Sequence, residues 1–115
     1  MKYKGSCHCG QVVFEVEGEL EQLTDCNCSI CSRLGSLLWF VPREKLHLLT
    51  SEANLSSYAF GERTIQHHFC PTCGIHPFGE GVDPKGNRMA AINVRCLEEV
   101  DHSALPLNHY DGRAL

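Results

Sequence analysis

The chain has 115 residues, of which 43% are hydrophobic, and its formal net charge is −4. This length and apolar content are typical of one globular domain, covering residues 1–115, with a core of modest size. The acidic balance argues against a nucleic-acid partner, which attracts a basic face, and the sequence lacks the polybasic cluster that a membrane surface binds.

Short strands dominate the hydrophobic pattern. In Gln11–Glu17, the residues Val12, Phe14 and Val16 fall on one face and Glu15 and Glu17 on the opposite face, which predicts a half-buried strand. The same kind of short apolar or alternating run predicts further strands at Leu37–Val41, Leu46–Leu49, Leu55–Phe60, Arg63–Phe69 and Arg88–Val94.

Turns and loops separate these strands. We predict a short helical turn at Ser32–Gly35 and a hairpin turn at Gly61–Glu62. Asp83–Gly86 has Asp first, Pro second and Gly fourth, the chemistry of a type I turn. The tail, Glu98–Leu115, has little periodicity and predicts a loop with one short helix at most. The whole pattern indicates an all-β fold, a sandwich or curved sheet with cysteine-rich loops at its end.

Seven of the eight cysteines fall in three tight clusters. Two of these clusters are pairs, and together they form what we call the four-cysteine cluster: Cys7, Cys9, Cys70 and Cys73. The third cluster, which we call the triplet, is Cys26, Cys28 and Cys31. The longest apolar run is too short to cross a bilayer, and the N-terminus has no apolar signal core, so we expect a cytoplasmic protein. A reducing compartment keeps thiols free, which favours metal over disulfides.

The two kinds of cluster predict two kinds of zinc site. A structural zinc is held by four protein ligands and contributes folding energy directly, and the four-cysteine cluster offers such a set. The triplet offers three ligands, the number found in catalytic zinc sites that keep an exchangeable fourth position. A fourth ligand from Cys96, His67, His68 or His76 is the alternative, and it would make the second site structural too. Cys96 is also expected to be buried beside the last strand.

The triplet favours thiol chemistry over hydrolysis. Three thiolates donate so much electron density that zinc becomes a poor Lewis acid for activating water. A soft site of this kind suits a substrate thiol as its fourth ligand, and zinc would keep that thiol ionised at neutral pH. Cys26, Cys28 and Cys31 are therefore the candidate catalytic residues.

Three motifs carry a resemblance: Gly-x-Cys-x-Cys-Gly at 5–10, Cys-x-Cys-x-x-Cys at 26–31, and Phe-Cys-x-x-Cys-Gly at 69–74. Together they resemble the glutathione-dependent formaldehyde-activating enzyme family, and Ile92–Leu97 is similar to that family's last strand. The resemblance implies a zinc-stapled β fold related to methionine sulfoxide reductase B. It also implies two zinc ions, a structural one on the four-cysteine cluster and a labile one on the triplet. The chain departs from the family in its compactness and in Asn27, where many members have histidine.

The resemblance further implies a reaction of carbon–sulfur lyase type, in which glutathione and formaldehyde form or leave S-hydroxymethylglutathione. We therefore expect a small-molecule thiol and aldehyde as partners. Glutathione has two carboxylates, which need cationic or backbone partners near the triplet. Arg33 is the nearest in sequence, and the other candidates are Arg43, Arg63, Arg88 and Arg95. A nearby histidine, His67 or His68, or water would protonate the new alkoxide.

Two other functions fit parts of the sequence. A non-catalytic zinc module that binds another protein would need a protein ligand at the fourth position of the triplet. A zinc ribbon that binds nucleic acid is disfavoured by the acidic charge. His8 lies between two ligands and is expected either to be exposed or to contact the ligands from outside, and Trp39 is expected in the core rather than in a substrate site.

Overall fold

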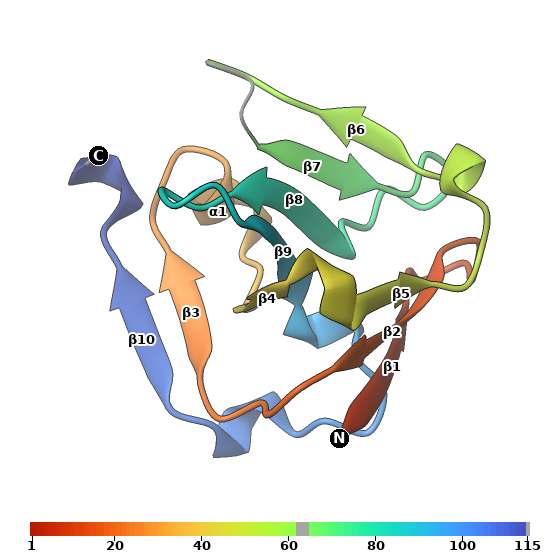
Figure 1. Ribbon diagram of the computed structural model, residues 1–115, viewed down its shortest axis with the longest axis horizontal. Coiled ribbons are helices and arrows are strands. Elements are labelled where there is room, and N and C mark those ends of the chain that lie inside the picture. Colours follow the sequence, from red (N-terminus) through yellow and green to blue (C-terminus); the bar gives the residue numbers. More distant parts are fainter. Residues whose placement is uncertain (62–64, 115) are drawn as a thin grey trace.

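The computed structural model describes residues 1–61 and 65–114. Within these residues, ten strands form two sheets (Figure 1). The strands are β1 (Lys2–Ser6), β2 (Val13–Glu17), β3 (Leu23–Cys26), β4 (Leu38–Pro42), β5 (Leu46–Leu48), β6 (Ser56–Tyr58), β7 (Gln66–Phe69), β8 (Phe78–Val82), β9 (Arg88–Asn93) and β10 (Leu107–Tyr110). The helical elements are short: α1 (Cys31–Leu34), η1 (Arg43–Lys45), η2 (Glu52–Asn54), η3 (Val94–Cys96), η4 (His102–Ala104) and η5 (Gly112–Ala114). The predicted all-β class is confirmed, and the relation to methionine sulfoxide reductase B stays a prediction.

The larger sheet has seven strands in the order β10-β3-β4-β9-β8-β7-β6. In Figure 1 it runs from β10 at the left, through β4 and β9 in the middle, to β6 at the top. The β10–β3 ladder is parallel, and the other ladders of this sheet are antiparallel. The β10–β3 pairing brings the end of the chain to Cys26, because Tyr110 is its partner in the ladder.

The smaller sheet is antiparallel, with the order β1-β2-β5. Its central strand, β2, buries Phe14 and Val16 completely against the larger sheet. The Phe14 ring meets Phe78 of β8 edge to face, with ring centroids 5.8 Å apart. Trp39 of β4 is 8% exposed and belongs to the same core, as expected. Burial of each such aromatic side chain contributes about 1.5–3 kcal/mol.

The predicted strands lie in the observed ones with shifts of a residue or two at their ends. The loop prediction for the tail is wrong at β10, which takes its place in the sheet by pairing with β3. Three more strands, β1, β3 and β8, were not predicted. The sequence of β8 is Phe-Gly-Glu-Gly-Val, and its two glycines suggest a turn rather than a strand. The strand predicted at Arg63–Phe69 is observed from Gln66 onward; residues 62–64, including part of the predicted hairpin turn, lie outside the described residues.

The predicted turn at Asp83–Gly86 is present. The Gly86 N–H donates to the Asp83 carbonyl at 3.0 Å, which closes the turn, and the Asp83 carboxylate accepts from the N–H groups of Lys85 and Asn87. In the part of the chain that the structure describes, no helix has the length and apolar character needed to cross a membrane.

Candidate metal centres

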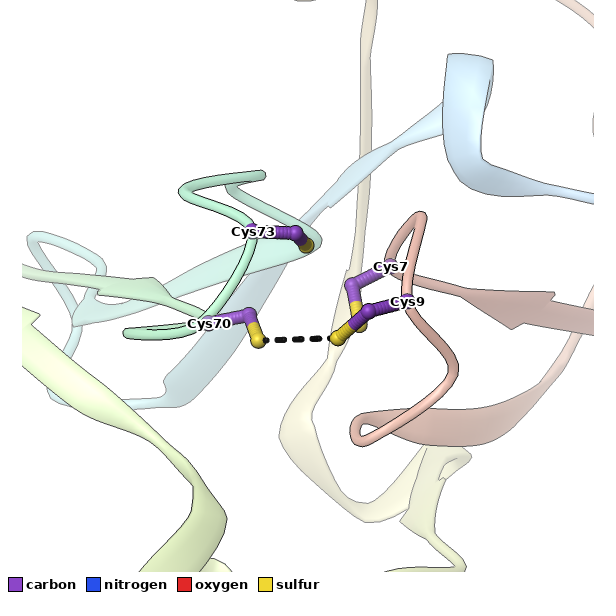
Figure 2. A group of neighbouring side chains, drawn as sticks. All are labelled: Cys7, Cys9, Cys70 and Cys73. Carbon is purple, nitrogen blue, oxygen red and sulfur yellow. Dashed lines mark hydrogen bonds between the residues drawn. The ribbon is translucent and has the colours of Figure 1, made fainter.

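The four-cysteine cluster joins two loops that are far apart in the sequence (Figure 2). Cys7 and Cys9 follow β1, whereas Cys70 and Cys73 follow β7, and their four sulfur atoms all lie within 4.8 Å of one another. The sulfur of Cys9 is 3.7 Å from that of Cys7 and 3.5 Å from that of Cys70. All of these cysteines are free thiols. Four convergent sulfurs form a complete set for a tetrahedral soft metal ion.

Both loops are shaped by backbone hydrogen bonds around the sulfurs. The Cys7 N–H donates to the Val12 carbonyl at 3.0 Å, and the Cys70 N–H donates to the Ile75 carbonyl at 2.9 Å. Gly74 closes the second loop with a φ of 79°, a left-handed conformation that favours glycine. Hydrogen bonds from backbone N–H groups, mainly that of Ile75 and then that of Cys9, lower the pKa of the Cys73 thiol to about 6. The loop therefore favours a thiolate, the form that binds metal.

The triplet forms a second group at the top of β3 in Figure 1, where the chain passes into α1. Its three sulfurs also lie within 4.8 Å of one another. Cys26 ends β3 and is buried, while Cys28 and Cys31 are half-buried. The helix is a single turn: the Ser32 N–H donates to the Cys28 carbonyl at 2.9 Å, and Gly35 ends the helix with a φ of 69°.

Electrostatics oppose three thiolates at the triplet in the absence of a cation. Burial, together with the neighbouring Cys28 and Cys26, raises the pKa of the Cys31 thiol. Burial also raises the pKa of Cys28, but hydrogen bonds led by the backbone N–H of Cys31 outweigh it, so this pKa is lowered overall. The Cys28 thiol therefore ionises more readily than the Cys31 thiol. A divalent soft metal ion would remove that repulsion, so the donor set fits such an ion.

The last residue of β10 and the three residues after it lie over the triplet, and we call this segment, Tyr110–Arg113, the C-terminal strap. Asn27, between the first two cysteines of the triplet, holds it. The Asn27 side chain donates to Asp111 Oδ1 at 2.9 Å and accepts from the Arg113 N–H at 3.0 Å. The Asn27 N–H also donates to the Tyr110 carbonyl at 3.1 Å. A Cβ at Gly112 would lie only 2.7 Å from the Cys26 sulfur, so the strap is in direct contact with the cluster.

The alternative fourth ligands lie elsewhere. Among the described residues, the group of potential ligands at the triplet contains neither a histidine nor a fourth cysteine. His67 stacks on Phe60, with ring centroids 5.6 Å apart, and His76 stacks on Phe69 at 5.2 Å. Both ring nitrogens of His68 form hydrogen bonds to other side chains. None of the three therefore joins the triplet's group.

Cys96, the remaining alternative, is half-buried against the main core, close to the expected position. Burial, and then the charges of Cys7 and Cys73, raise the pKa of its thiol to about 11. The cysteines that affect it electrostatically thus belong to the four-cysteine cluster rather than to the triplet. His8 is exposed, as expected.

The candidate arginines are at different places. Arg33 lies in α1 and donates to a carbonyl of the triplet's own loop at 2.7 Å. Arg43 and Arg88 both contact a carboxylate of β8, at the end of the β4–β9 ladder opposite the triplet. Arg95 is exposed in η3, and Arg63 lies outside the described residues. Of the four candidate arginines within the described residues, Arg33 is the one on the triplet loop.

The sequence profile of the glutathione-dependent formaldehyde-activating enzyme family matches residues 2–110. The chain belongs to this family. A Penicillium rubens protein that carries the family name is 34% identical over 79 residues, which are 64% of this chain and 41% of that protein. A crystal structure of a Rhodobacter sphaeroides protein is similar with a TM-score of 0.78 and 34% identity, covering 94% of this chain and 100% of that chain. The chain therefore spans less than half the length of the Penicillium rubens relative.

The sequence analysis did not identify one cation near the triplet, Arg113. Arg113 lies in a tail without periodicity, and only the β10–β3 pairing brings it to the triplet. Its Nε donates to the Asn27 carbonyl at 3.2 Å. No local pattern in the sequence signals Arg113, because its contact with Asn27 depends on this long-range pairing.

Proposed function

We propose that this protein is a zinc-dependent enzyme of carbon–sulfur lyase type, which forms or splits a glutathione–formaldehyde adduct such as S-hydroxymethylglutathione. The observation that carries the proposal is the triplet, a three-sulfur group separate from a complete four-sulfur group. Membership in the family supports the choice of glutathione and formaldehyde as substrates. The strap contacts support a cluster built into the fold rather than a chance grouping of thiols.

In this proposal the four-cysteine cluster has a structural role. A zinc ion is held by Cys7, Cys9, Cys70 and Cys73, and it fixes the end of β1 to the end of β7. These loops are distant in the sequence, since Cys9 and Cys70 are 61 positions apart. Although Cys9 is exposed, the four sulfurs already fill the tetrahedral positions of such an ion, so this site leaves no position for a substrate. Its role is to stabilise the folded chain.

The triplet has the reactive role. Cys26, Cys28 and Cys31 hold a second zinc ion, which when bound supplies one exchangeable position for a thiol sulfur and favours the thiolate form. Arg33 donates to a carbonyl of the triplet loop and Arg113 donates to the Asn27 carbonyl, and both carry positive charge suited to the carboxylates of glutathione. Formation of the adduct joins the glutathione sulfur to the formaldehyde carbon. The thiol loses its proton, and the oxygen of formaldehyde gains one to become the hydroxyl group of the adduct.

Exchange spectroscopy by NMR tests the proposal. Glutathione, formaldehyde and their adduct are brought to equilibrium, and the exchange rate is measured with the zinc-loaded protein and with Cys28→Ala. Because the uncatalysed addition is already fast, an equilibrium exchange rate is more informative than a steady-state assay. Cys96→Ala is the matched control, since this cysteine lies outside both groups.

We expect the protein and Cys96→Ala to accelerate exchange and Cys28→Ala to leave it at the buffer value. If the zinc-loaded protein leaves the exchange at the buffer rate with several thiols and aldehydes, the catalytic proposal fails. The non-catalytic zinc module that binds another protein would then be the better account.

A further inference from the structure

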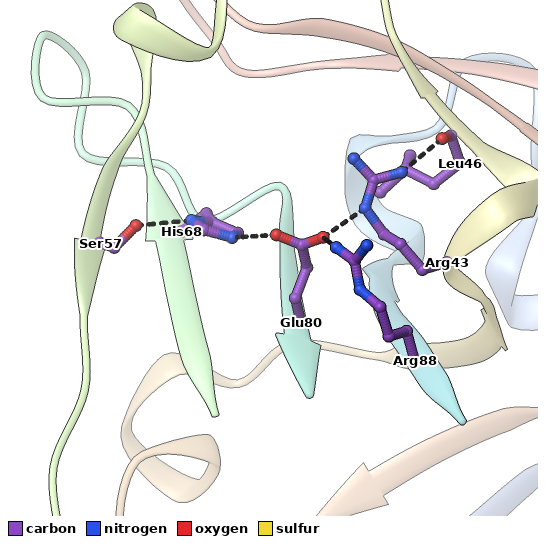
Figure 3. Close-up of polar contacts among 6 residues, drawn as sticks. All are labelled: Arg43, Leu46, Ser57, His68, Glu80 and Arg88. Carbon is purple, nitrogen blue, oxygen red and sulfur yellow. Dashed lines mark hydrogen bonds and ion pairs between the residues drawn. The ribbon is translucent and has the colours of Figure 1, made fainter. Parts of the chain in front are cut away.

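A hydrogen-bonded chain of side chains links β6, β7 and β8 (Figure 3). Ser57 Oγ lies 2.6 Å from His68 Nδ1, and His68 Nε2 lies 2.6 Å from Glu80 Oε2. Ser57 and His68 are direct partners in the β6–β7 ladder. The three side chains thus form a row of hydroxyl, imidazole and carboxylate, held in register by the sheet.

Arg43 fixes the carboxylate end of this row. Its Nε donates to Glu80 Oε1, and its Nη1 donates to the Leu46 carbonyl at 2.7 Å. Burial raises the pKa of Glu80, but the hydrogen bonds from His68 and Arg43 outweigh it, so the pKa is lowered overall. Glu80 is therefore a carboxylate at neutral pH, and a carboxylate only accepts hydrogen bonds.

The position of the protons follows from this. Because Glu80 only accepts, His68 Nε2 is the donor in this contact, which leaves Nδ1 as the nitrogen that can accept from a neighbouring hydroxyl. Nδ1 then accepts from the Ser57 hydroxyl, which donates its hydrogen. This is the arrangement of a nucleophile, a general base and an orienting group.

The row lines a pocket of about 180 Å³. Its apolar walls come from Leu48, Leu55 and Phe78, and its polar side includes Ser57, His68 and Glu80. A water molecule takes about 30 Å³ in the liquid, so the pocket has room for a short acyl group of a few heavy atoms. Ser57 is exposed, which leaves its hydroxyl accessible from solvent.

A purely structural role accounts for only part of this arrangement. The hydrogen bond of Glu80 with His68 and its ion pair with Arg43 already link β7, β8 and η1. Ser57 adds an exposed residue whose hydroxyl is directed at His68 Nδ1 and borders the pocket. These features suit reaction rather than support.

We propose that Ser57 is a second reactive centre of this protein, a nucleophile with His68 as its general base, which accepts short acyl groups from esters or thioesters. Glu80 and Arg43 are positioning residues that hold the imidazole. In the reaction, the Ser57 oxygen forms a bond to the acyl carbon while its proton moves to His68. The bond from carbon to the alcohol or thiol breaks, and the leaving group takes that proton. Water then releases the acyl group as a carboxylic acid and restores Ser57.

A small fluorophosphonate is the probe for this centre, because it transfers its phosphonyl group to activated serine hydroxyls and loses fluoride. The zinc-loaded protein is labelled, and the modified residue is located by peptide mass spectrometry. Ser56→Ala is the matched control: Ser56 is the neighbour of Ser57 in β6, and its side chain points to the other face of the strand.

We expect labelling at Ser57 in the protein and in Ser56→Ala, and none in Ser57→Ala. In His68→Gln, labelling of Ser57 should be about 10²-fold slower, the usual contribution of a general base. An unlabelled Ser57, or labelling at the same rate in a folded His68→Gln, overturns the proposal. If His68→Gln does not fold, the first comparison still decides it, because exposed Ser57 can be changed without loss of the core. The test uses neither glutathione nor formaldehyde, so its result is independent of the function of the triplet.

Discussion

Substitution of Gly112 by alanine probes the contact between the C-terminal strap and the triplet. The added Cβ would lie 2.7 Å from the Cys26 sulfur and 2.9 Å from the Cys28 Cβ. Ordinary contacts of a Cβ begin near 3.4 Å, so one side must move by 3.4 − 2.7 = 0.7 Å. Both contact atoms belong to short side chains, one at the end of β3 and one in the loop that follows it, which leaves the strap as the part that moves.

The size of the effect follows from two costs. Overpacking of a tight site costs about 1–3 kcal/mol. Release of the strap instead breaks its side-chain hydrogen bonds to Asn27, at about 0.5–1.5 kcal/mol each. The structure relaxes in whichever of these two ways costs less free energy, so we expect the free energy of unfolding to fall by about 1–3 kcal/mol.

Denaturant unfolding gives the free energy, and hydrogen exchange of the Asn27 amide gives the local effect, because this N–H donates to Tyr110 in the strap. We expect faster exchange at Asn27 in Gly112→Ala. Gly86→Ala is the control, since Gly86 has a φ of 87° and open space around it, and its cost is backbone strain alone. Unchanged stability together with unchanged exchange at Asn27 in Gly112→Ala would refute the strap contact.

Three further outcomes follow from the two clusters and from the side chains around Glu80. Native mass spectrometry of reduced protein should find two zinc ions per chain, one for each group of cysteines, without the mass loss of disulfides; a single zinc contradicts the two-site account. Cys73→Ala should unfold or aggregate the protein, whereas Cys28→Ala should stay folded with one zinc, as judged by circular dichroism and metal analysis; equal unfolding would make both sites structural. Because the pKa of Glu80 is lowered, its stabilisation is present above its ordinary value of about 4.5 and is lost as the pH falls through the lowered value. The stability difference between the protein and Glu80→Gln should therefore shrink below about pH 4.5 in denaturant titrations, and a pH-independent difference would contradict the ionised state of Glu80.

The grouping of the cysteines could be predicted because spacing along the chain reflects chemistry. Pairs beside glycines suit a closed four-ligand site, and the structure brings Cys7 and Cys9 to Cys70 and Cys73. The alternation in Gln11–Glu17 likewise predicted a strand, because the buried face of β2 has a period of two residues. These signals are local, so the sequence alone carries them.

Long-range pairing carries no such local signal. The polar run of β10 is exposed at all four positions, so it has no hydrophobic alternation, and its parallel pairing with β3 depends on contacts distant in the sequence. For the same reason the strap, with Gly112 against Cys26, could not be predicted. Ser57, His68 and Glu80 are separated by 11 and 12 positions, and only the register of β6, β7 and β8 brings them together.

Zinc K-edge absorption spectroscopy, with and without glutathione, tests most directly whether the triplet keeps an exchangeable position. With four sulfurs on one zinc and three on the other, we predict an average of about 3.5 sulfur ligands per zinc in the protein alone. Addition of glutathione should raise this average to about 4, and Cys28→Ala should abolish the rise. An average of about 4 before glutathione is added, with no change afterwards, would contradict an open thiol-binding site at Cys26, Cys28 and Cys31.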